Sequence, residues 1–316
     1  MSRTAPDVIS IVLLLMGASV AVRVWRDNII CRDGEVLRSD DLVAAVSLRS
    51  CIMRTLVLTG AGVSAESGIP TFRGRDGYWR NLDPAKLATP EAFASDPKLV
   101  WEWYRERRQR IRNARPNAAH EAIARLAQRT DEFLLVTQNV DDLHARAGIE
   151  KENMVQIHGD IFVTRCTRCD FRGTGRGGSP EPPGACVVQP TNRRLRSIAA
   201  TSERDLNLPT CPKCQALMRP DVVWFGEQLS QDELERVEDF LDGGACDVVV
   251  VVGTTATFGY IIDWALRASR DGAELIEVNP EETPLSRFAT RLVREPAAIA
   301  LPRLVGELTA SRSSIL

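Results

Sequence analysis

Residues 60–73 read GAGVSAESGIPTFR, and this stretch decides the fold of the 316-residue chain. It follows a short apolar run, residues 55–58, that is typical of a buried strand. Glycines at 60, 62 and 68 allow a tight turn and a close approach to a ligand. Residues 64–67 can open a helix whose free N–H groups point at an anion. The order of strand, Gly-rich turn and helix N-terminus predicts a pyrophosphate site.

The spacing of these glycines, G-x-G-x5-G, meets only half of the dinucleotide fingerprint G-x-G-x-x-G. A glycine-rich surface loop is therefore the alternative interpretation. Pro70, Phe72 and Arg73 add a rigid corner, an aromatic ring and a cation to the loop. These additional residues indicate that the loop has a further function besides binding a pyrophosphate.

The composition is that of an ordinary soluble chain, with 44% hydrophobic and 26% charged residues. A formal net charge of −2 gives no electrostatic case for nonspecific binding of nucleic acid. The chain has eight cysteines, and four of them form two C-x-x-C pairs. This usage favours metal ligation in a reducing compartment, so we expect a cytoplasmic protein rather than a disulfide-stapled one.

Residues 1–52 form an N-terminal extension of uncertain status. Residues 8–22 are mostly apolar and have Arg3 before them and Arg23 and Arg26 after them. The run is short for a membrane-spanning helix. It also suits a signal peptide, an amphipathic or buried helix, or an untranslated segment before a start at Met53. We favour an appended or untranslated segment, with no membrane association.

The rest of the chain alternates between predicted strands and helices, which indicates an α/β fold with a doubly wound parallel sheet. The strands are expected at 55–58, 133–137, 155–157, 247–252 and 274–278, and the helices at 97–113, 118–128, 231–241 and 260–270. In such sheets a ligand lies across the carboxyl ends of the strands, so the loops that follow are expected to converge on one site. Residues 170–208 break the pattern and are expected to form a long loop.

The two C-x-x-C pairs predict a structural zinc site. Its ligands are Cys166, Cys169, Cys211 and Cys214. Four thiolates complete a tetrahedral shell and leave no open position for catalysis. Redox motifs or unrelated free cysteines are the alternatives.

Polar residues follow several of the predicted strands. Gln138, Asn139 and Asp141 suit ribose hydroxyls and a carboxamide, although Asn139 or Asp141 also suits a helix N-cap. His158 lies at a strand-to-loop exit that suits an acid or base, whereas His120 and His144 lie in helical patterns and are expected to be structural.

Two further motifs are candidates for ligand contacts. Residues 222–227, VVWFGE, suit an apolar tunnel, an edge that pairs with a peptide, or a core strand. Residues 250–255, VVVGTT, and Asn279 offer further polar contacts to a dinucleotide.

Taken together, these motifs resemble the sirtuins, NAD-dependent protein-lysine deacylases, from residue 53 to about residue 305. The resemblance rests on residues 60–73, TQNVDDLH at 137–144, HGD at 158–160, the two C-x-x-C pairs, RPDVVWFGE at 219–227, VGTT at 252–255 and EVNPE at 277–281. It implies a catalytic domain over 53–312. Rossmann-like parts are expected at about 53–83, 131–165 and 218–312, with a helical part at about 84–130. The zinc module is expected at about 160–217, with an insertion at 170–208.

The resemblance also implies a reaction and a role for each matching residue. The acyl-lysine carbonyl oxygen attacks the ribose C1′ of NAD as nicotinamide leaves. His158 then acts as general base on a ribose hydroxyl, and water releases lysine and O-acyl-ADP-ribose. Asn139 shares the catalytic role with His158. The residues implied in cofactor binding are Gly60, Ala61, Gly62, Ser64, Ala65, Glu66, Phe72, Arg73, Gln138, Asn139, Asp141, Gly253, Thr254, Thr255, Asn279 and Ala297.

Residues 222–225, namely Val222, Val223, Trp224 and Phe225, are implied in lining the acyl-lysine tunnel and pairing with the substrate backbone. Tyr104 and Arg107 lie three apart on a predicted helix and so share a face, where they suit a carboxylate or form part of a solvated Arg-rich face. In the class III branch this pair, together with a small residue at Ala88, marks preference for succinyl- and malonyl-lysine. We therefore expect desuccinylase or demalonylase activity beside deacetylase activity.

The chain departs from the family pattern at Thr255, where Ser is usual, and at Phe258 and Tyr260, where Val and Pro are usual. These changes affect the expected pairing with substrate and the adenine side. The rival classes are an NAD-dependent oxidoreductase, a zinc-ribbon nucleic-acid module and a mono-ADP-ribosyltransferase. The expected partners are acylated proteins, and the sequence does not indicate an oligomeric state.

Overall fold

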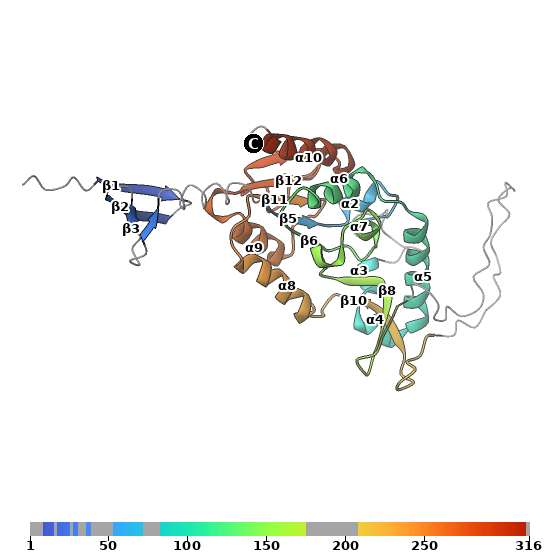
Figure 1. Cartoon of the computed structure of the whole chain (residues 1–316). Coiled ribbons are helices and arrows are strands. Elements are labelled where there is room, and N and C mark those ends of the chain that lie inside the picture. The colour runs from blue at the N-terminus through green and yellow to red at the C-terminus, as the bar shows by residue number, and fades with distance from the viewer. Residues whose placement is uncertain are drawn as a thin grey trace, which may run out of the picture.

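A computed structural model describes residues 53–71, 83–173 and 208–310 with their side chains, and the backbone of residues 9–15, 18–25, 28–30, 36–38, 174 and 311–313. At its centre is a six-stranded parallel sheet with the strand order β13-β12-β11-β5-β6-β7 (Figure 1). The strands are β5 (Arg54–Thr59), β6 (Glu132–Thr137), β7 (Met154–Gln156), β11 (Val248–Val252), β12 (Glu274–Val278) and β13 (Arg291–Val293). The predicted doubly wound parallel sheet is confirmed.

The sheet has its topological switch point between β5 and β11. From β5 the chain adds β6 and β7 on one side, and it then returns to add β11, β12 and β13 on the other. The four central strands end level with one another, because Thr59 pairs with both Thr137 and Val252, and Val252 pairs with Val278. The loops that follow these strands therefore begin along one line, at the crevice where open α/β sheets bind ligands.

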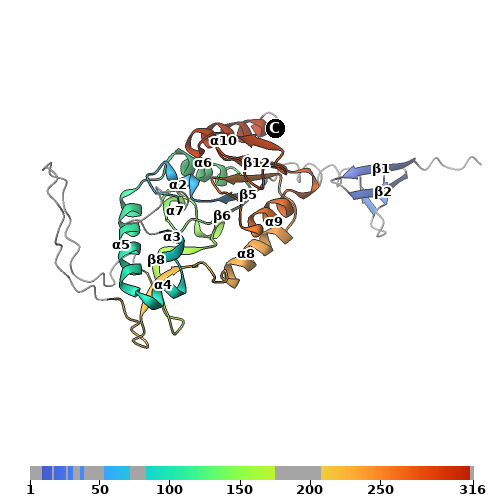
Figure 2. The same ribbon diagram turned by 180° about the vertical axis from the view of Figure 1, so that it is seen from behind.

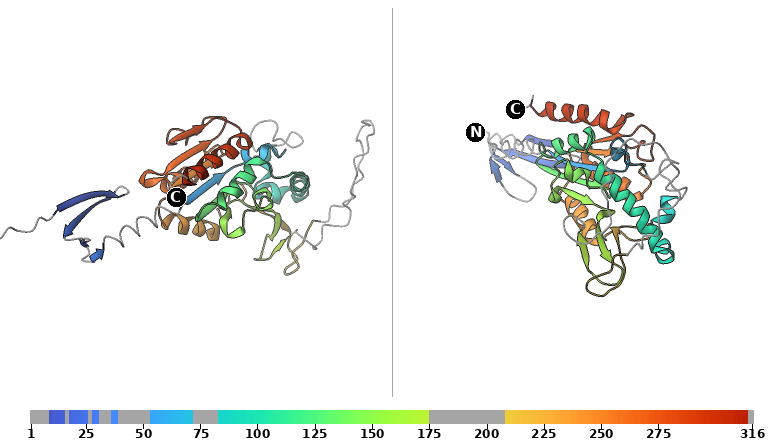
Figure 3. Two further views of the ribbon diagram at one scale, coloured as in Figure 1. Left: turned by 45° about the horizontal axis from the view of Figure 1, so that its top comes forward. Right: turned by 90° about the vertical axis from the view of Figure 1, so that its right-hand side faces the viewer.

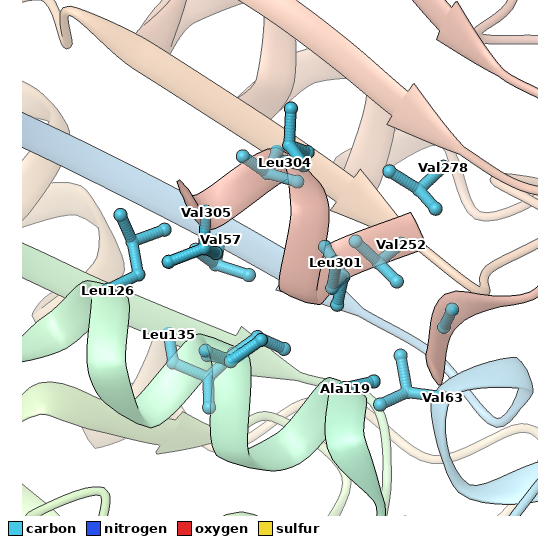
Figure 4. Close-up of a cluster of buried hydrophobic side chains, with 14 of the residues drawn as sticks. Val57, Val63, Ala119, Leu126, Leu135, Val252, Val278, Leu301, Leu304 and Val305 are labelled. Atoms are coloured by element: carbon cyan, nitrogen blue, oxygen red, sulfur yellow. The ribbon is translucent and has the colours of Figure 1, made fainter. Parts of the chain in front are cut away.

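Helices cover both faces of the sheet, as seen from opposite sides in Figures 1 and 2. One face carries α6 (Ala118–Ala127) and α10 (Ala297–Ser313), which lie side by side in Figure 3, and the other carries α8 (Gln231–Asp242) and α9 (Gly259–Ala268). Side chains of successive residues in β5 point to opposite faces of the sheet. Val57 packs toward α6 and α10 (Figure 4), and Leu58 packs toward α8 and α9. Covering both faces explains why the strands are continuously apolar.

A helical part and a small antiparallel sheet accompany the parallel sheet. The helices are α3 (Pro84–Leu87), α4 (Pro90–Ser95) and α5 (Pro97–Asn113), and each begins with a proline after a side-chain N-cap, Asp83, Thr89 or Asp96. The small sheet has the order β10-β8-β9, formed by β8 (Gly159–Cys166), β9 (Arg172–Thr174) and β10 (Met218–Val222). Two short helices, α2 (Gly62–Ala65) and α7 (Leu143–Arg146), follow β5 and β6.

The N-terminal segment differs from each helical interpretation of residues 8–22. Strands β1 (Ile9–Leu15), β2 (Ala18–Trp25), β3 (Asn28–Ile30) and β4 (Val36–Arg38) form a separate antiparallel sheet. The physical reason is the content of β-branched valine and isoleucine, which favours strands over helices. Among the described residues, no helix has the length and apolar character needed to cross a membrane.

The predicted loop at 170–208 is wrong at its start, where residues 172–174 form β9 and pair with β8. Most of the remaining loop lies outside the described residues. The helix α10 and the strand β13 were not predicted. Pro302 lies inside α10 and interrupts the sequence signal of that helix.

Candidate active site

Two glycine-containing loops pack directly on one another beside the switch point. The Gly60 N–H donates to Val252 O at 3.1 Å, and the Gly62 N–H donates to Gly253 O at 2.8 Å. A Cβ on Gly62 would lie 2.8 Å from Gly253 Cα, and one on Gly60 would lie 2.8 Å from the Thr254 Cβ. The glycines are thus required by the contact between the two loops, a reason different from the predicted approach to a ligand.

The predicted helix after this turn is present as α2, but its first N–H groups are not free to bind an anion. Gly62 donates to Gly253 O, Val63 to Gly60 O and Ser64 to Ala61 O. Free N–H groups were predicted for residues 64–67. Within that segment Ser64 donates to Ala61 O and Ser67 donates to Ser64 O, so the prediction is wrong for these two residues, because carbonyls of the same turn take their bonds.

Ser64 is the centre of a buried polar cluster at the ends of β5 and β6. Its hydroxyl donates to Asp141 Oδ2 at 2.9 Å and accepts from Asn139 Nδ2 at 3.2 Å. His120 Nε2 lies 3.4 Å from the same oxygen. All four residues are buried. The structure thus brings together three residues predicted for the cofactor, and His120, expected to be structural, lies directly beneath them.

Asp141 makes a local hydrogen bond at the start of α7, as one of its two interpretations predicted. Its Oδ1 accepts the N–H of Leu143, the first residue of α7, at 3.1 Å. Burial raises the pKa of Asp141 above its ordinary value, against the hydrogen bonds from Leu143 and Ser64 that lower it. The carboxylate is therefore a local cap that also lies among the cofactor candidates.

His158 lies just before β8 and is held on both sides of its ring. Its Nδ1 lies 3.0 Å from the carbonyl oxygen of Gln138, and its Nε2 lies 2.7 Å from the hydroxyl of Tyr260. Burial lowers the pKa of His158, opposed by the bond to Gln138. A neutral imidazole is the form that accepts a proton, so this environment suits a general base.

The residues predicted for the adenosine end form a connected group. Thr254 Oγ1 donates to Gln138 Oε1 at 2.6 Å, and Asn279 Nδ2 donates to Thr254 O at 2.7 Å. Gly253 precedes Thr254 with a φ of +60°. Thr255 lies apart from this group, with its hydroxyl 3.2 Å from that of Thr257.

Four further cofactor candidates belong to α2 with its flanking residues and to the start of α10. Glu66 accepts the N–H of Ala298 at 2.7 Å, next to Ala297, which begins α10. A carboxylate at this position stabilises the positive end of the helix. Ala61 is half-buried and Ala65 is exposed. Phe72 and Arg73 lie outside the described residues.

The substrate candidates gather in one apolar cluster. Ala88, Tyr104, Val222 and Trp224 belong to a single group of buried side chains. Trp224 Nε1 donates to the Tyr104 hydroxyl at 2.8 Å. Because the phenol accepts this bond, its own proton is directed elsewhere. The interpretation of residues 104 and 107 as part of a solvated face is wrong for Tyr104, which is 0% exposed.

Arg107 adds a cation to this cluster. Its guanidinium carbon lies 4.9 Å from the centre of the Trp103 ring and 5.8 Å from that of Tyr104. Burial lowers the pKa of Arg107, whereas the charges of Tyr104 and Asp141 act to raise it. A guanidinium in such surroundings favours the arrival of an anion.

Residues 223–225 follow β10, lead into a turn at Phe225 and are hydrogen-bonded to neighbouring segments. The Val223 N–H donates to His158 O at 2.9 Å, and the Phe225 N–H donates to Ala88 O at 2.9 Å. The Arg219 guanidinium carbon lies 3.3 Å from the centre of the Trp224 ring. Phe225 is 46% exposed. These N–H groups are therefore already used, and any pairing of this segment with a peptide needs its other backbone groups.

The four predicted metal ligands come together. The sulfur atoms of Cys166, Cys169, Cys211 and Cys214 all lie within 4.8 Å of one another. Tetrahedral zinc with Zn–S bonds of about 2.3 Å places its sulfurs roughly 3.8 Å apart. The pairs Cys166–Cys214 and Cys169–Cys211 lie at 3.4 and 3.6 Å. The donor set and spacing fit zinc.

Two supporting residues were missed by sequence reasoning, although their signals are present. Asn117 caps α6 in a capping box with His120, and its Nδ2 donates to Val63 O at 2.8 Å. The Asn-x-x-His spacing before a helical pattern was the available signal. Tyr260 was noted only as a departure from a pattern, and nothing near it in sequence pointed to His158.

Comparison with known proteins identifies the family of the chain. A family model described as the Sir2 family matches residues 60–258. An NAD-dependent protein deacylase 1 of Caldanaerobacter subterraneus subsp. tengcongensis is 44% identical over 235 residues, covering 74% of this chain and 86% of the relative. An NAD-dependent protein deacylase of Pyrococcus abyssi is 41% identical over 259 residues, covering 80% and 92%.

Solved structures agree as well. A mutant Sir2 homologue in complex with 2′-O-acetyl ADP ribose has a TM-score of 0.69 and 39% identity, covering 82% of this chain and 93% of its own. A Sir2 homologue in complex with NAD has a TM-score of 0.69 and 38% identity, covering 87% and 95%. A Sir2 complex with a p53 peptide and NAD⁺ has a TM-score of 0.63 and 28% identity, covering 84% and 97%. The chain therefore belongs to the Sir2 family of NAD-dependent protein deacylases, as the motifs at 60–73, 137–144 and 158–160 indicated.

Proposed function

We propose that this protein removes acyl groups from lysine side chains of proteins, with NAD as co-substrate, and releases nicotinamide and O-acyl-ADP-ribose. The acyl groups are acetyl and, in addition, succinyl and malonyl. The observation that carries the proposal is the meeting of Ser64, Asn139 and Asp141 with the neighbouring His158, at the carboxyl ends of parallel strands. The relatives named above are described as NAD-dependent protein deacylases.

In this proposal each polar group has a defined task. Asn139 and Asp141 hold the nicotinamide ribose and carboxamide, and Ser64 fixes both by its two hydrogen bonds. His158 receives the proton of a ribose hydroxyl at Nε2, because Nδ1 is engaged by the Gln138 carbonyl. Phe72 is proposed to shield the nicotinamide pocket, and Arg73 is proposed to face the phosphate and ribose region.

The acidic acyl groups are proposed from the surroundings of Arg107. A succinyl or malonyl group carries a carboxylate that an acetyl group lacks. Tyr104 offers a hydroxyl proton and Arg107 a planar cation, beside a cluster of buried apolar side chains that the Arg219 guanidinium also contacts. Charge-assisted hydrogen bonds of this kind contribute about 1.5–3 kcal/mol. The small side chain of Ala88 leaves room beside them.

The test is a panel of acetyl-, succinyl- and malonyl-lysine peptides with NAD, in which mass spectrometry identifies the products. We expect free lysine, nicotinamide and O-acyl-ADP-ribose in equal amounts, and no product from the His158→Tyr variant. Reduction of NAD, or ADP-ribose attached to protein, would instead support an oxidoreductase or an ADP-ribosyltransferase.

Acyl preference is tested by Arg107→Met, with Arg110→Met as the matched control on the exposed side of the same helix. Loss of about 1.5–3 kcal/mol corresponds to roughly a 10- to 100-fold fall in kcat/KM for succinyl-lysine. Acetyl-lysine turnover should change by less than about threefold, and the control variant should keep both activities. An equal loss for both substrates would refute the assignment.

We further propose one structural zinc ion, held by the four cysteines at the base of the small sheet, and a cytoplasmic location. The N–H groups of Arg168 and Cys169 point at Cys166 Sγ at 3.3 and 3.4 Å and so favour its thiolate. Thiolates persist in a reducing compartment, and this supports the location.

A further inference from the structure

The hydroxyl of Tyr260 lies 2.7 Å from Nε2 of His158, the atom that the proposed reaction needs as its base. Tyr260 is the second residue of α9 and is half-buried. None of the cofactor, substrate or metal assignments above uses this residue. The presence of a phenol at the reactive nitrogen of the imidazole therefore needs an explanation.

The directions of the hydrogen bonds follow from the partners. The carbonyl oxygen of Gln138 can only accept, so His158 Nδ1 carries the proton. In the neutral ring Nε2 then holds the lone pair, and the Tyr260 hydroxyl must donate to it. The side chain of Gln138 also hydrogen-bonds the phenol and acts to lower its pKa, as a donor to the phenol oxygen would. One residue thus engages both ends of the His158–Tyr260 pair.

Aromatic contacts fix the position of the phenol. The ring of Tyr260 stacks on Phe258 with centroids 5.6 Å apart and an interplanar angle of 17°, and it packs on Trp264 at 4.9 Å. Phe258 also presents its ring to His158 in an edge arrangement at 5.8 Å. The hydroxyl is therefore held in place before any ligand arrives, rather than carried on a free side chain.

We propose that Tyr260 is a positioning residue for His158: its hydroxyl fixes the Nδ1-protonated tautomer and aims the Nε2 lone pair until a ribose hydroxyl replaces it. This inference rests on the proposed function, in which His158 is the general base. It adds a third support to the ring beside the Gln138 carbonyl and the edge of Phe258.

A donor to Nε2 stabilises the neutral imidazole, so the contact also lowers the affinity of His158 for a proton. The groups in contact with the ring come from three elements: Gln138 after β6, Phe258 before α9, and Tyr260 within α9. Among these three, Tyr260 is the titratable one, and its own pKa is raised by burial. A shift on its removal can thus be assigned to the hydroxyl.

The test compares Tyr260→Phe with the wild type in the full chain. Long-range ¹H–¹⁵N spectra report the tautomer and the pKa of each imidazole, and the chain has three histidines. The other two do not interfere, because burial lowers the pKa of His120 to about 4 and that of His144 well below its ordinary value. We expect an Nδ1–H tautomer in the wild type and a His158 pKa higher by about half a unit to one unit in the variant.

The same shift should appear in the acid limb of the pH profile of kcat/KM for deacylation. At pH values on this acid limb, kcat/KM of Tyr260→Phe should be about three- to tenfold lower than that of the wild type. The rate of nicotinamide exchange should change by less than about twofold, because that exchange precedes the step in which the base acts. The matched control is Trp264→Phe, which removes a donor to Glu238 from the same helix but keeps both the phenol and an aromatic ring beside it.

Two results would overturn the inference. One is an unchanged pKa and tautomer of His158 in Tyr260→Phe. The other is an equal shift in Trp264→Phe, which would assign the effect to helix packing. The spectra need no acyl substrate, so either result would leave the proposed function standing, whereas failure of the peptide panel would leave the tautomer measurement intact.

Discussion

Replacing Gly253 by alanine tests whether the site loops are locked together. Gly253 has a φ of +60°, and a Cβ there would lie 2.6 Å from Val63 N and 2.8 Å from Gly62 C. These are backbone atoms, so no side chain can swing aside. Gly226 is the matched control, because it has a φ of +85° and nothing within 4 Å of its Cβ position.

The expected magnitudes differ between the two variants. A left-handed backbone conformation costs alanine about 1–2 kcal/mol, which both variants share. Gly253→Ala must also separate the loops until the contact reaches the 3.4 Å of ordinary packing. That displacement strains the bonds from Gly62 N–H to Gly253 O and from Gly60 N–H to Val252 O, each with a net worth of about 0.5–1.5 kcal/mol. We expect losses in the free energy of unfolding of about 2–5 kcal/mol for Gly253→Ala and about 1–2 kcal/mol for Gly226→Ala.

Urea unfolding followed by tryptophan fluorescence measures both values, since the chain has six tryptophans. The Gly253 variant should also bind NAD more weakly, because its loops no longer meet. If the two variants lose the same stability within about 0.5 kcal/mol, the loops separate without cost. The glycines would then serve ligand approach, as the sequence alone suggested.

Two further predictions concern the metal site and the buried histidines. Cys214→Ser should lower bound zinc from about one equivalent to near zero and expose the small sheet to protease, and retention of the full equivalent would place the ion elsewhere. The pKa of His120 falls from about 6.5 unfolded to about 4 folded, so the unfolded chain binds more protons between these pH values. Stability should therefore fall by up to about 3 kcal/mol as the pH drops through this window. His120→Asn should flatten that slope in urea titrations, and an unchanged slope would contradict the assignment.

The parallel sheet was accessible from sequence because each central strand is a continuous apolar run. Helix α5 was predicted at its observed bounds, since Asp96 and Pro97 mark its start and its apolar periodicity is clear. The four cysteines were equally accessible, because C-x-x-C spacing fixes two ligands at once. In each case the signal is local in the chain.

Features that depend on distant contacts were not accessible. The two glycines of the first loop suggested room for a ligand, yet their nearest neighbours are Gly253 and Thr254, almost 200 positions away in the chain. Likewise Tyr260 reaches His158 across 102 positions, and Trp224 reaches Tyr104 across 120. No spacing rule joins such pairs, because they are set by how the strands are ordered in the sheet.

The hydrogen bonds that run from Asn279 through Thr254 to Gln138, and from there to His158, place two ends of the site in one thermodynamic cycle. A ligand that contacts Thr254 at the proposed adenosine end is connected through Gln138 to the carbonyl that accepts the hydrogen bond of the imidazole. By linkage, if NAD binding shifts the pKa of His158, then protonation of His158 must change the affinity for NAD by the same factor. Substrate affinity and proton affinity are thus reciprocal quantities in this enzyme, and a calorimetric titration of NAD at several pH values reads one from the other.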